Sequence, residues 1–254
     1  WSLLLIGSYY FYSTFDPQYL FLLAATTLVA YGFGIVVAKP FRQTTRRLLL
    51  TAGILVELSS LFLFKYFDFL MGSFEPLLTN LNIISDAVAL PRLDIILPVG
   101  LSFYTFSCIS YIVDAYRKTI EPERHLGKLA VYLAFFPKLL AGPIERAPAF
   151  LAQLAKPITV DRIAIITGLQ LIVWGLFKKV VIADRLAVFV DAGFTNPAFQ
   201  SPVTVVVAVY FYAFQIYCDF SGYSDIAIGA SLILGIRLME NFRRPYLAKS
   251  VPEF

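Results

Sequence analysis

The chain has 254 residues, of which 59% are hydrophobic and 15% are charged, and its formal net charge at pH 7 is +4. This composition leaves too little polar surface to cover a water-soluble globule, so it excludes a soluble domain and predicts an integral membrane protein. The basic residues are spread over several loops, which argues against a nucleic-acid partner. The apolar runs are continuous over about 15 to 25 residues, which predicts an all-α polytopic protein and not a β-barrel.

Apolar runs separated by charged loops define the elements of the first half. A short run over 1–15 precedes three expected spans, at 19–38, 48–70 and 95–113. Loop 39–47 contains four basic residues and no acid, and 114–128 is also rich in Lys and Arg, so the positive-inside rule places both loops in the cytoplasm. Segment 71–94 is expected to be an external loop, because it contains Glu75, Asp86 and Asp94 against one basic residue, Arg92. An interfacial helix within this segment is an open alternative.

The apolar run at 129–141 is too short to cross about 30 Å of hydrocarbon. It contains Pro137 and ends at Gly142-Pro143, so we expect a re-entrant half-helix in which these three residues shape the backbone. Such a broken helix is tolerated only where protein or water covers it, which places it beside an interior cavity. Two further spans are expected at 163–190 and 203–217, and the basic residues from 237 to 249 indicate a last cytoplasmic region.

Two acids interrupt the apolar sequence in the string YCDFSGYSD, residues 217–225. An ionised Asp at the bilayer centre costs about 2.5 to 3.5 kcal/mol, so such residues usually face a cavity that carries substrate, ions or protons. We expect Ser221-Gly222 to break the helix, which would let Asp219 and Asp225 turn toward one cavity. The candidate tunnel-lining residues are Asp219, Ser221, Tyr223, Ser224 and Asp225.

Structural roles compete with these functional ones. The five residues of the string could equally hold helices together through hydrogen bonds, without touching a substrate. Arg146, beside the expected re-entrant turn, could receive the phosphates of an anionic donor or could contact lipid headgroups. His125 is the only histidine and lies among charged residues, as expected of a solvated loop, and the sequence shows no metal-ligand pattern.

Ordered sequence blocks carry a resemblance to the membrane-bound O-acyltransferases. The blocks LPVGLSFYTF at 97–106 and FFPKLLAGPIER at 135–146 look like that family as a whole. The blocks GLFKKVVIADRL at 175–186, YCDFSGYSD at 217–225 and ENFRRPY at 240–246 are similar to its bacterial alginate O-acetyltransferase branch. The resemblance is strong over 95–254, whereas the earlier part agrees mainly in hydropathy and in the basic loop.

The resemblance implies a fold and an activity. The fold would be a bundle of tilted and re-entrant helices around a tunnel, in the bacterial inner membrane. The activity would be transfer of an acetyl group from a cytoplasmic donor, acetyl-CoA or an acylated carrier, to an exported polysaccharide such as alginate. An extracytoplasmic acetyltransferase partner is implied, and no bound cofactor. The essential histidine of the family follows the Glu-Phe that matches Glu253-Phe254, so we expect 1–254 to be a single membrane domain, incomplete at both ends and inactive alone.

Two alternatives remain open. A family member that transfers D-alanine to teichoic acid is the nearer one, but its relatives match the 175–186 block less well. The other is an ion-coupled transporter, because intramembrane acids and broken helices also build such carriers. Carriers usually show two related halves, and this sequence has no visible internal repeat.

Overall fold

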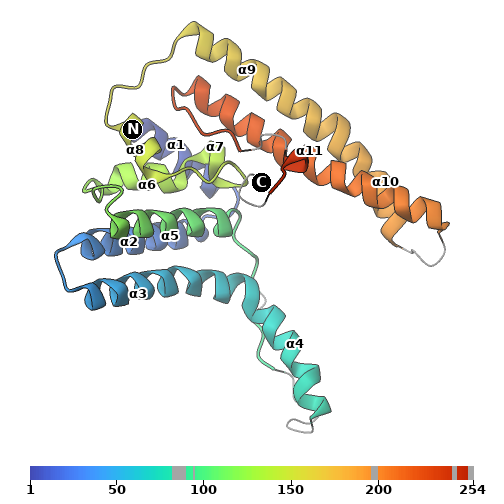
Figure 1. Ribbon diagram of the computed structural model, residues 1–254, viewed down its shortest axis with the longest axis horizontal. Coiled ribbons are helices and arrows are strands. Elements are labelled where there is room, and N and C mark those ends of the chain that lie inside the picture. Colours follow the sequence, from blue (N-terminus) through green and yellow to red (C-terminus); the bar gives the residue numbers. More distant parts are fainter. Residues whose placement is uncertain (82–89, 94, 196–199, 242–244, 251–254) are drawn as a thin grey trace. The chain divides into compact units, whose positions relative to one another are not determined.

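The structure, a computed structural model, describes residues 1–81, 90–93, 95–195, 200–241 and 245–250. Asp86, Asp94, Glu253-Phe254 and residues 242–244 of the last sequence block lie outside this described part. All regular elements within it are helices, which confirms the all-α prediction (Figure 1). Four helical runs among the described residues are long and apolar enough to cross a membrane: Tyr19–Ala38, Gln43–Thr79, Arg162–Thr195 and Pro202–Ile233.

The chain folds into two compact units. The first comprises Trp1–Phe136 and Arg146–Pro148, and the second comprises Pro137–Glu145 and Ala149–Phe254. The single membrane domain expected from the sequence therefore stays a prediction. The helices of the first unit are α1 (Ser2–Ser13), α2 (Tyr19–Ala38), α3 (Gln43–Leu61), α4 (Phe67–Asn80), α5 (Leu101–Arg117) and α6 (Leu126–Ala134).

Helices α2, α3 and α5 pack against one another in the first unit. A Cβ added at Gly34 of α2 would lie 2.5 Å from the ring of Tyr111 on α5, so glycine is what permits this close approach. Large apolar side chains also point away from the core, and Phe21 on α2 is 80% exposed. Outward apolar side chains are expected on a helix whose solvent is lipid.

The helix that begins at Gln43 continues well beyond the predicted span. A π-helical turn, Phe62–Tyr66, joins α3 to α4, and α4 leaves this turn in a new direction (Figure 1). Residues 71–80 are therefore helical, which agrees with the alternative of a helix within this segment and not with a loop throughout. Apolar residues such as Phe74 and Leu77 extend the helical pattern here, and Pro76 is accommodated inside the helix.

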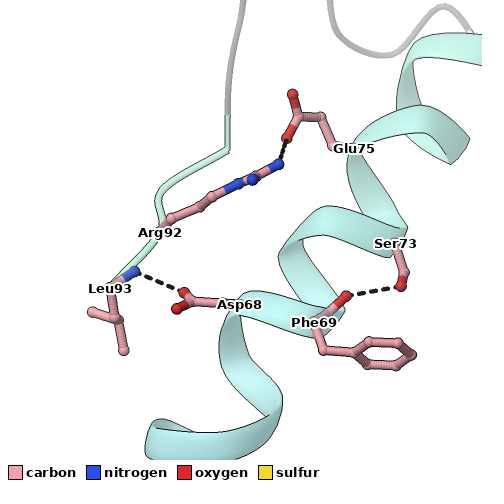
Figure 2. A network of polar contacts seen from close by, with 6 residues as sticks. All are labelled: Asp68, Phe69, Ser73, Glu75, Arg92 and Leu93. Carbon is pink, nitrogen blue, oxygen red and sulfur yellow. Dashed lines mark hydrogen bonds and ion pairs between the residues drawn. The ribbon is translucent and has the colours of Figure 1, made fainter. Parts of the chain in front are cut away.

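The segment after α4 returns along that helix and is attached to it by polar contacts. The guanidinium of Arg92 lies 3.2 Å from the carboxylate of Glu75, and the Leu93 N–H donates to the Asp68 carboxylate at 2.7 Å (Figure 2). Ser73 donates to the Phe69 carbonyl within α4, at 2.8 Å. Glu75 and Asp68 thus attach residues 92 and 93 to α4.

Helix α5 begins at Leu101, six residues later than the sequence predicts. Pro98 precedes a turn in which the Leu101 N–H donates to the Pro98 carbonyl at 3.2 Å. Gly100 has φ 74°, a left-handed conformation that favours glycine. Turn chemistry therefore overrides the apolar character of residues 95–99.

The predicted interruption of the 129–141 run is confirmed, although the helix begins earlier. Helix α6 ends at Ala134, Phe135 has a non-helical ψ of 108°, and α7 (Phe136–Leu139) adds only four residues. The nine residues of α6 extend about 14 Å. Neither piece can cross a membrane alone.

The second unit is built on two antiparallel helices that lie side by side (Figure 1). Glycines at Gly168 and Gly175 of one helix meet Gly229 and Gly222 of the other, and a Cβ at Gly175 would lie 2.5 Å from the Gly222 carbonyl oxygen. Small residues of this kind let two membrane helices approach through their backbones. The elements of this part of the chain are α8 (Ala147–Leu154), α9 (Arg162–Leu176), a π-helical segment (Phe177–Ala183), α10 (Asp184–Thr195), α11 (Pro202–Ile233) and a 3₁₀ turn (Pro245–Leu247).

Helix α11 passes through Ser221-Gly222 without a break, so the predicted helix break was wrong. A glycine inside a helix costs only about 1 kcal/mol relative to alanine, which packing can offset. Here the glycine serves the contact with Gly175 instead of a kink. The 32 residues of α11 extend about 48 Å.

Candidate functional site

A largely buried charged contact joins the π-helical segment to α11. The Lys178 ammonium forms a close ion pair with the Asp225 carboxylate and donates to Ser221 Oγ at 2.7 Å. Lys178 is only 9% exposed. Ser221 and Asp225 are four residues apart, so a continuous helix presents both on one face. The predicted convergence of Asp219 and Asp225 on one cavity stays a prediction.

A second, more exposed cluster lies beside the first. The Lys179 ammonium lies 2.5 Å from the Asp219 carboxylate and 3.0 Å from that of Asp184. About half of the Asp219 side chain is exposed, 51%, against 20% for Asp225. The two acids of the string are therefore both paired, but in different surroundings.

The approach of the two lysines to α11 depends on Gly222. A Cβ added at Gly222 would lie 3.1 Å from the Lys179 backbone nitrogen and 3.2 Å from the Lys178 Cβ. The two lysines lie in a π-helical segment, in which each turn contains an extra residue. Such segments occur often at functional sites. Glycine and the wider turn together bring two adjacent cations to one helix.

The same stretch of α11 also meets two irregular segments. Asn241 donates to Ser224 Oγ at 3.1 Å, and the Tyr223 phenol interacts with the backbone of Ala141. The buried Glu145 carboxylate accepts from the Met239 N–H at 2.6 Å. We define the α11 junction as residues 219–225 of α11 together with the residues that contact them: Lys178, Lys179, Ala141 and Asn241.

The segment after α11 does not leave the helix. The Tyr246 hydroxyl donates to the Ala213 carbonyl at 2.7 Å, and the Tyr246 ring packs against Tyr217 at 5.7 Å between centroids. Ala213 lies about 30 Å along α11 from Ile233. The sequence predicts a cytoplasmic region from Arg237 onward, whereas this part of it returns along the helix because polar groups there find partners on α11.

The residues of the expected re-entrant turn are buried, and their backbone is tightly constrained. The Gly142 N–H donates to the Lys138 carbonyl at 3.0 Å, and a Cβ at Gly142 would collide with the Lys138 backbone. Pro137 and Pro143 are buried, and the Lys138 ammonium lies 4.9 Å from the centre of the Phe150 ring. The geometry thus requires glycine at 142.

Arg146 and His125 have different environments in the first unit. The Arg146 guanidinium lies 3.3 Å from the buried Asp114 carboxylate and donates to Ser110 Oγ at 3.4 Å, yet 64% of its side chain is exposed. His125 is exposed, and its ring packs edge-on against Trp1 at 4.6 Å between centroids. A role for Arg146 in contacting an anionic donor stays a prediction.

Lys178, Lys179 and Asn241 were not among the predicted site residues. The signal for the lysines was present, because two adjacent cations in one apolar run need acidic partners and the next apolar run supplies two. No comparable signal marks Asn241, whose contact with Ser224 depends on the returning segment.

The fold and the junction define a polytopic helical membrane protein with ion pairs between its helices. The family model described as MBOAT, membrane-bound O-acyltransferase family, matches residues 123–254. The chain is 39% identical to the probable alginate O-acetylase of Pseudomonas aeruginosa, over 99% of this chain and 48% of that protein. It therefore belongs to the membrane-bound O-acyltransferase family.

Two further relatives have different printed activities. The chain is 33% identical to a peptidoglycan O-acetyltransferase of Helicobacter pylori, over 99% of this chain and 51% of that protein. It is 27% identical to a teichoic acid D-alanyltransferase of Bacillus subtilis, over 61% of this chain and 40% of that protein. The chain thus spans about half the length of the curated relatives that it matches.

Proposed function

We propose that the protein is a membrane O-acyltransferase that moves acetyl groups from a cytoplasmic donor to an exported polysaccharide such as alginate. Family membership supports the acyl transfer, and the identity of 39% to probable alginate O-acetylases supports acetyl over D-alanyl, for which the identity is 27%. The donor in this proposal is acetyl-CoA or an acylated carrier. The site of action is the bacterial inner membrane, together with an extracytoplasmic acetyltransferase partner.

The α11 junction is the single observation from which we assign particular residues to this function. Acyl transfer to a hydroxyl needs a group to accept the proton, stabilisation of the oxyanion and exclusion of water. In this proposal Asp219, Ser221 and Asp225 form part of the wall of the acyl path. The apolar faces of the surrounding helices exclude water from it.

In this proposal the ion pairs fix the positions of these acids along the acyl path. Lys178 keeps Asp225 and Ser221 in fixed positions, and the contact of Tyr223 with Ala141 holds the broken 137–145 segment against α11. A charged group held by partners can line a passage within the membrane at a lower cost than a free one. We assign His125 no part in the chemistry, because it is exposed and packs on Trp1.

Acetylation by variants of the full-length protein tests the proposal. The variants Asp225→Asn and Asp219→Asn are produced in a host that makes alginate but lacks its own O-acetylase, with Asp191→Asn, on the exposed surface of α10, as the matched control. We expect Asp225→Asn to lower the acetyl content per unit of membrane-inserted protein by at least about tenfold, the loss expected when a charge-assisted interaction is removed. Asp225→Glu, which keeps the charge, should retain more activity than Asp225→Asn.

Two results would overturn this assignment. Unchanged acetylation by both Asn variants at normal protein levels would remove these acids from the acyl path. A second host makes teichoic acid but lacks its own D-alanyltransferase. A gain of D-alanyl esters there, with no acetyl esters on alginate in the first host, would replace the acetyl group in the proposal by D-alanine.

A further inference from the structure

A polar cavity of about 240 Å³ lies in the second unit, where α9 begins and α11 ends. Its walls come from the end of α8, the connection to α9 and the turn after α11. The lining residues that bear on its chemistry are Gln153, Lys156, Thr159, Asp161, Gly235 and Arg237. None of its lining residues belongs to the α11 junction; along α11 the nearest of them, Leu232, lies seven residues beyond Asp225.

Two contacts build this cavity from segments that are far apart in the sequence. The side-chain amide of Gln153 accepts from the Arg237 N–H at 2.8 Å and donates to the Arg237 carbonyl at 2.9 Å. Gly235 has φ 77°, and a Cβ there would lie 2.5 Å from Cγ2 of Ile158. Glutamine and glycine therefore hold the turn after α11 against the segment that precedes α9.

The charges around the cavity favour an anion. Lys156 and Arg237 both line it and both are exposed to solvent. The one acid in the lining, Asp161, already caps α9, because its carboxylate accepts from the Ala164 N–H at 2.6 Å. Two cations and one carboxylate line the cavity, so the lining keeps an excess of one positive charge. A guanidinium binds phosphate oxygens in a bidentate manner, and an ammonium adds a second charged donor.

The position of the cavity along the helices indicates a membrane surface. Lys156, Arg162 and Arg237 lie at the same end of the α9–α11 pair, the end that the positive-inside rule places in the cytoplasm. Basic pockets between helices on this side are suited to the phosphate groups of anionic lipids. A soluble phosphate ester would find the same donors.

We propose that this cavity binds an anionic phosphate group at the cytoplasmic surface, carried either by a lipid headgroup or by a soluble phosphate ester. Gln153 positions Arg237, while Arg237 and Lys156 contact the phosphate oxygens. This assignment does not depend on the acyl group or on the acceptor of the proposed reaction.

Binding to the purified full-length protein tests the proposal. Native mass spectrometry measures retention of phosphatidylglycerol against phosphatidylcholine, and calorimetry measures binding of pyrophosphate. The double variant Lys156→Gln with Arg237→Gln is compared with Arg117→Gln with Arg124→Gln, which removes the same charge from exposed positions of the first unit. We expect at least about tenfold weaker binding in the first double variant alone, since charge-assisted contacts are lost.

A third variant separates a built cavity from a charged surface. Gln153→Leu keeps the net charge but removes both contacts to Arg237, so it should also weaken binding. A selective loss of phosphatidylglycerol identifies a lipid headgroup, and a selective loss of pyrophosphate identifies a soluble ester. The proposal is overturned if neither probe binds, if both double variants bind alike, or if Gln153→Leu binds as the unmodified protein does.

Discussion

Lys178 and Asp225 form an ion pair between the π-helical segment and α11, and Ser221 accepts a hydrogen bond from the same ammonium group. Lys178 lies about 24 Å along its helix from Arg162, a distance comparable to most of the hydrocarbon thickness of a bilayer. The ammonium group of a lysine that is only 9% exposed needs an anionic partner. The pair therefore links the local packing of two helices to the placement of polar groups inside the membrane.

Removing one member of this pair should be strongly destabilising. Asp225→Leu leaves the buried Lys178 ammonium without its counter-charge, and the expected loss of unfolding free energy is about 3 to 5 kcal/mol. Thermal unfolding of the purified protein in detergent measures the change. The double variant Asp225→Leu with Lys178→Met should recover much of this loss, because it removes both charges; a double variant as unstable as the single one contradicts the explanation.

The ion pair between Arg92 and Glu75 should behave differently. It lies at the exposed edge of α4 (Figure 2), and exposed pairs contribute about 0 to 1 kcal/mol. Arg92→Gln should therefore leave the unfolding temperature almost unchanged under the same conditions. A loss comparable to that of Asp225→Leu would show that the segment around residue 92 depends on this contact.

The glycine contacts between α9 and α11 predict a position-specific effect of an added methyl group. Gly222→Ala places a Cβ 2.8 Å from the Gly175 carbonyl oxygen and should cost about 1 to 3 kcal/mol of unfolding free energy. Gly32→Ala on α2 is the matched control, because nothing lies within 4 Å of its added Cβ and alanine favours a helix. Equal unfolding temperatures for the two variants would argue against close backbone contact at Gly222.

Glu57 offers a case in which removal of a charge-bearing side chain should stabilise the protein. It is 1% exposed on α3, and neither carboxyl oxygen has a hydrogen-bond partner among the described residues. Glu57→Met keeps a similar volume without the unsatisfied polar atoms, so unfolding should require about 1 to 3 kcal/mol more. Glu57→Gln keeps the polar atoms and should gain less. Lower stability of Glu57→Met would reveal a partner or a function for this acid.

Several features of the fold could be predicted from the sequence because their causes are local. The apolar runs at 19–38 and 203–217 contain enough consecutive apolar residues to indicate membrane helices, and both are helical. Pro137 and the short run around it indicated an interrupted helix, which the non-helical Phe135 confirms. The ordered blocks likewise pointed to the family to which the chain belongs.

Other features depended on contacts that a single stretch of sequence does not show. The Ser-Gly pair at 221–222 is typical of a helix break, yet α11 is continuous there. Gly222 instead contacts Gly175, which lies 47 positions away in the chain. The partners of Asp219 and Asp225 also come from a different helix. Helix ends such as Leu101 depend on turns in which proline and glycine override hydropathy.

The sequence by itself determined the class of protein, its helical character and the location of its intramembrane acids, because hydropathy and residue type are properties of each segment alone. Only the tertiary structure decided which cation each acid meets, how α9 and α11 approach, and where the segment after α11 lies. Those outcomes depend on the free energy of interaction between two segments, namely of pairing charges and packing backbones in an apolar environment. Neither segment determines that free energy alone.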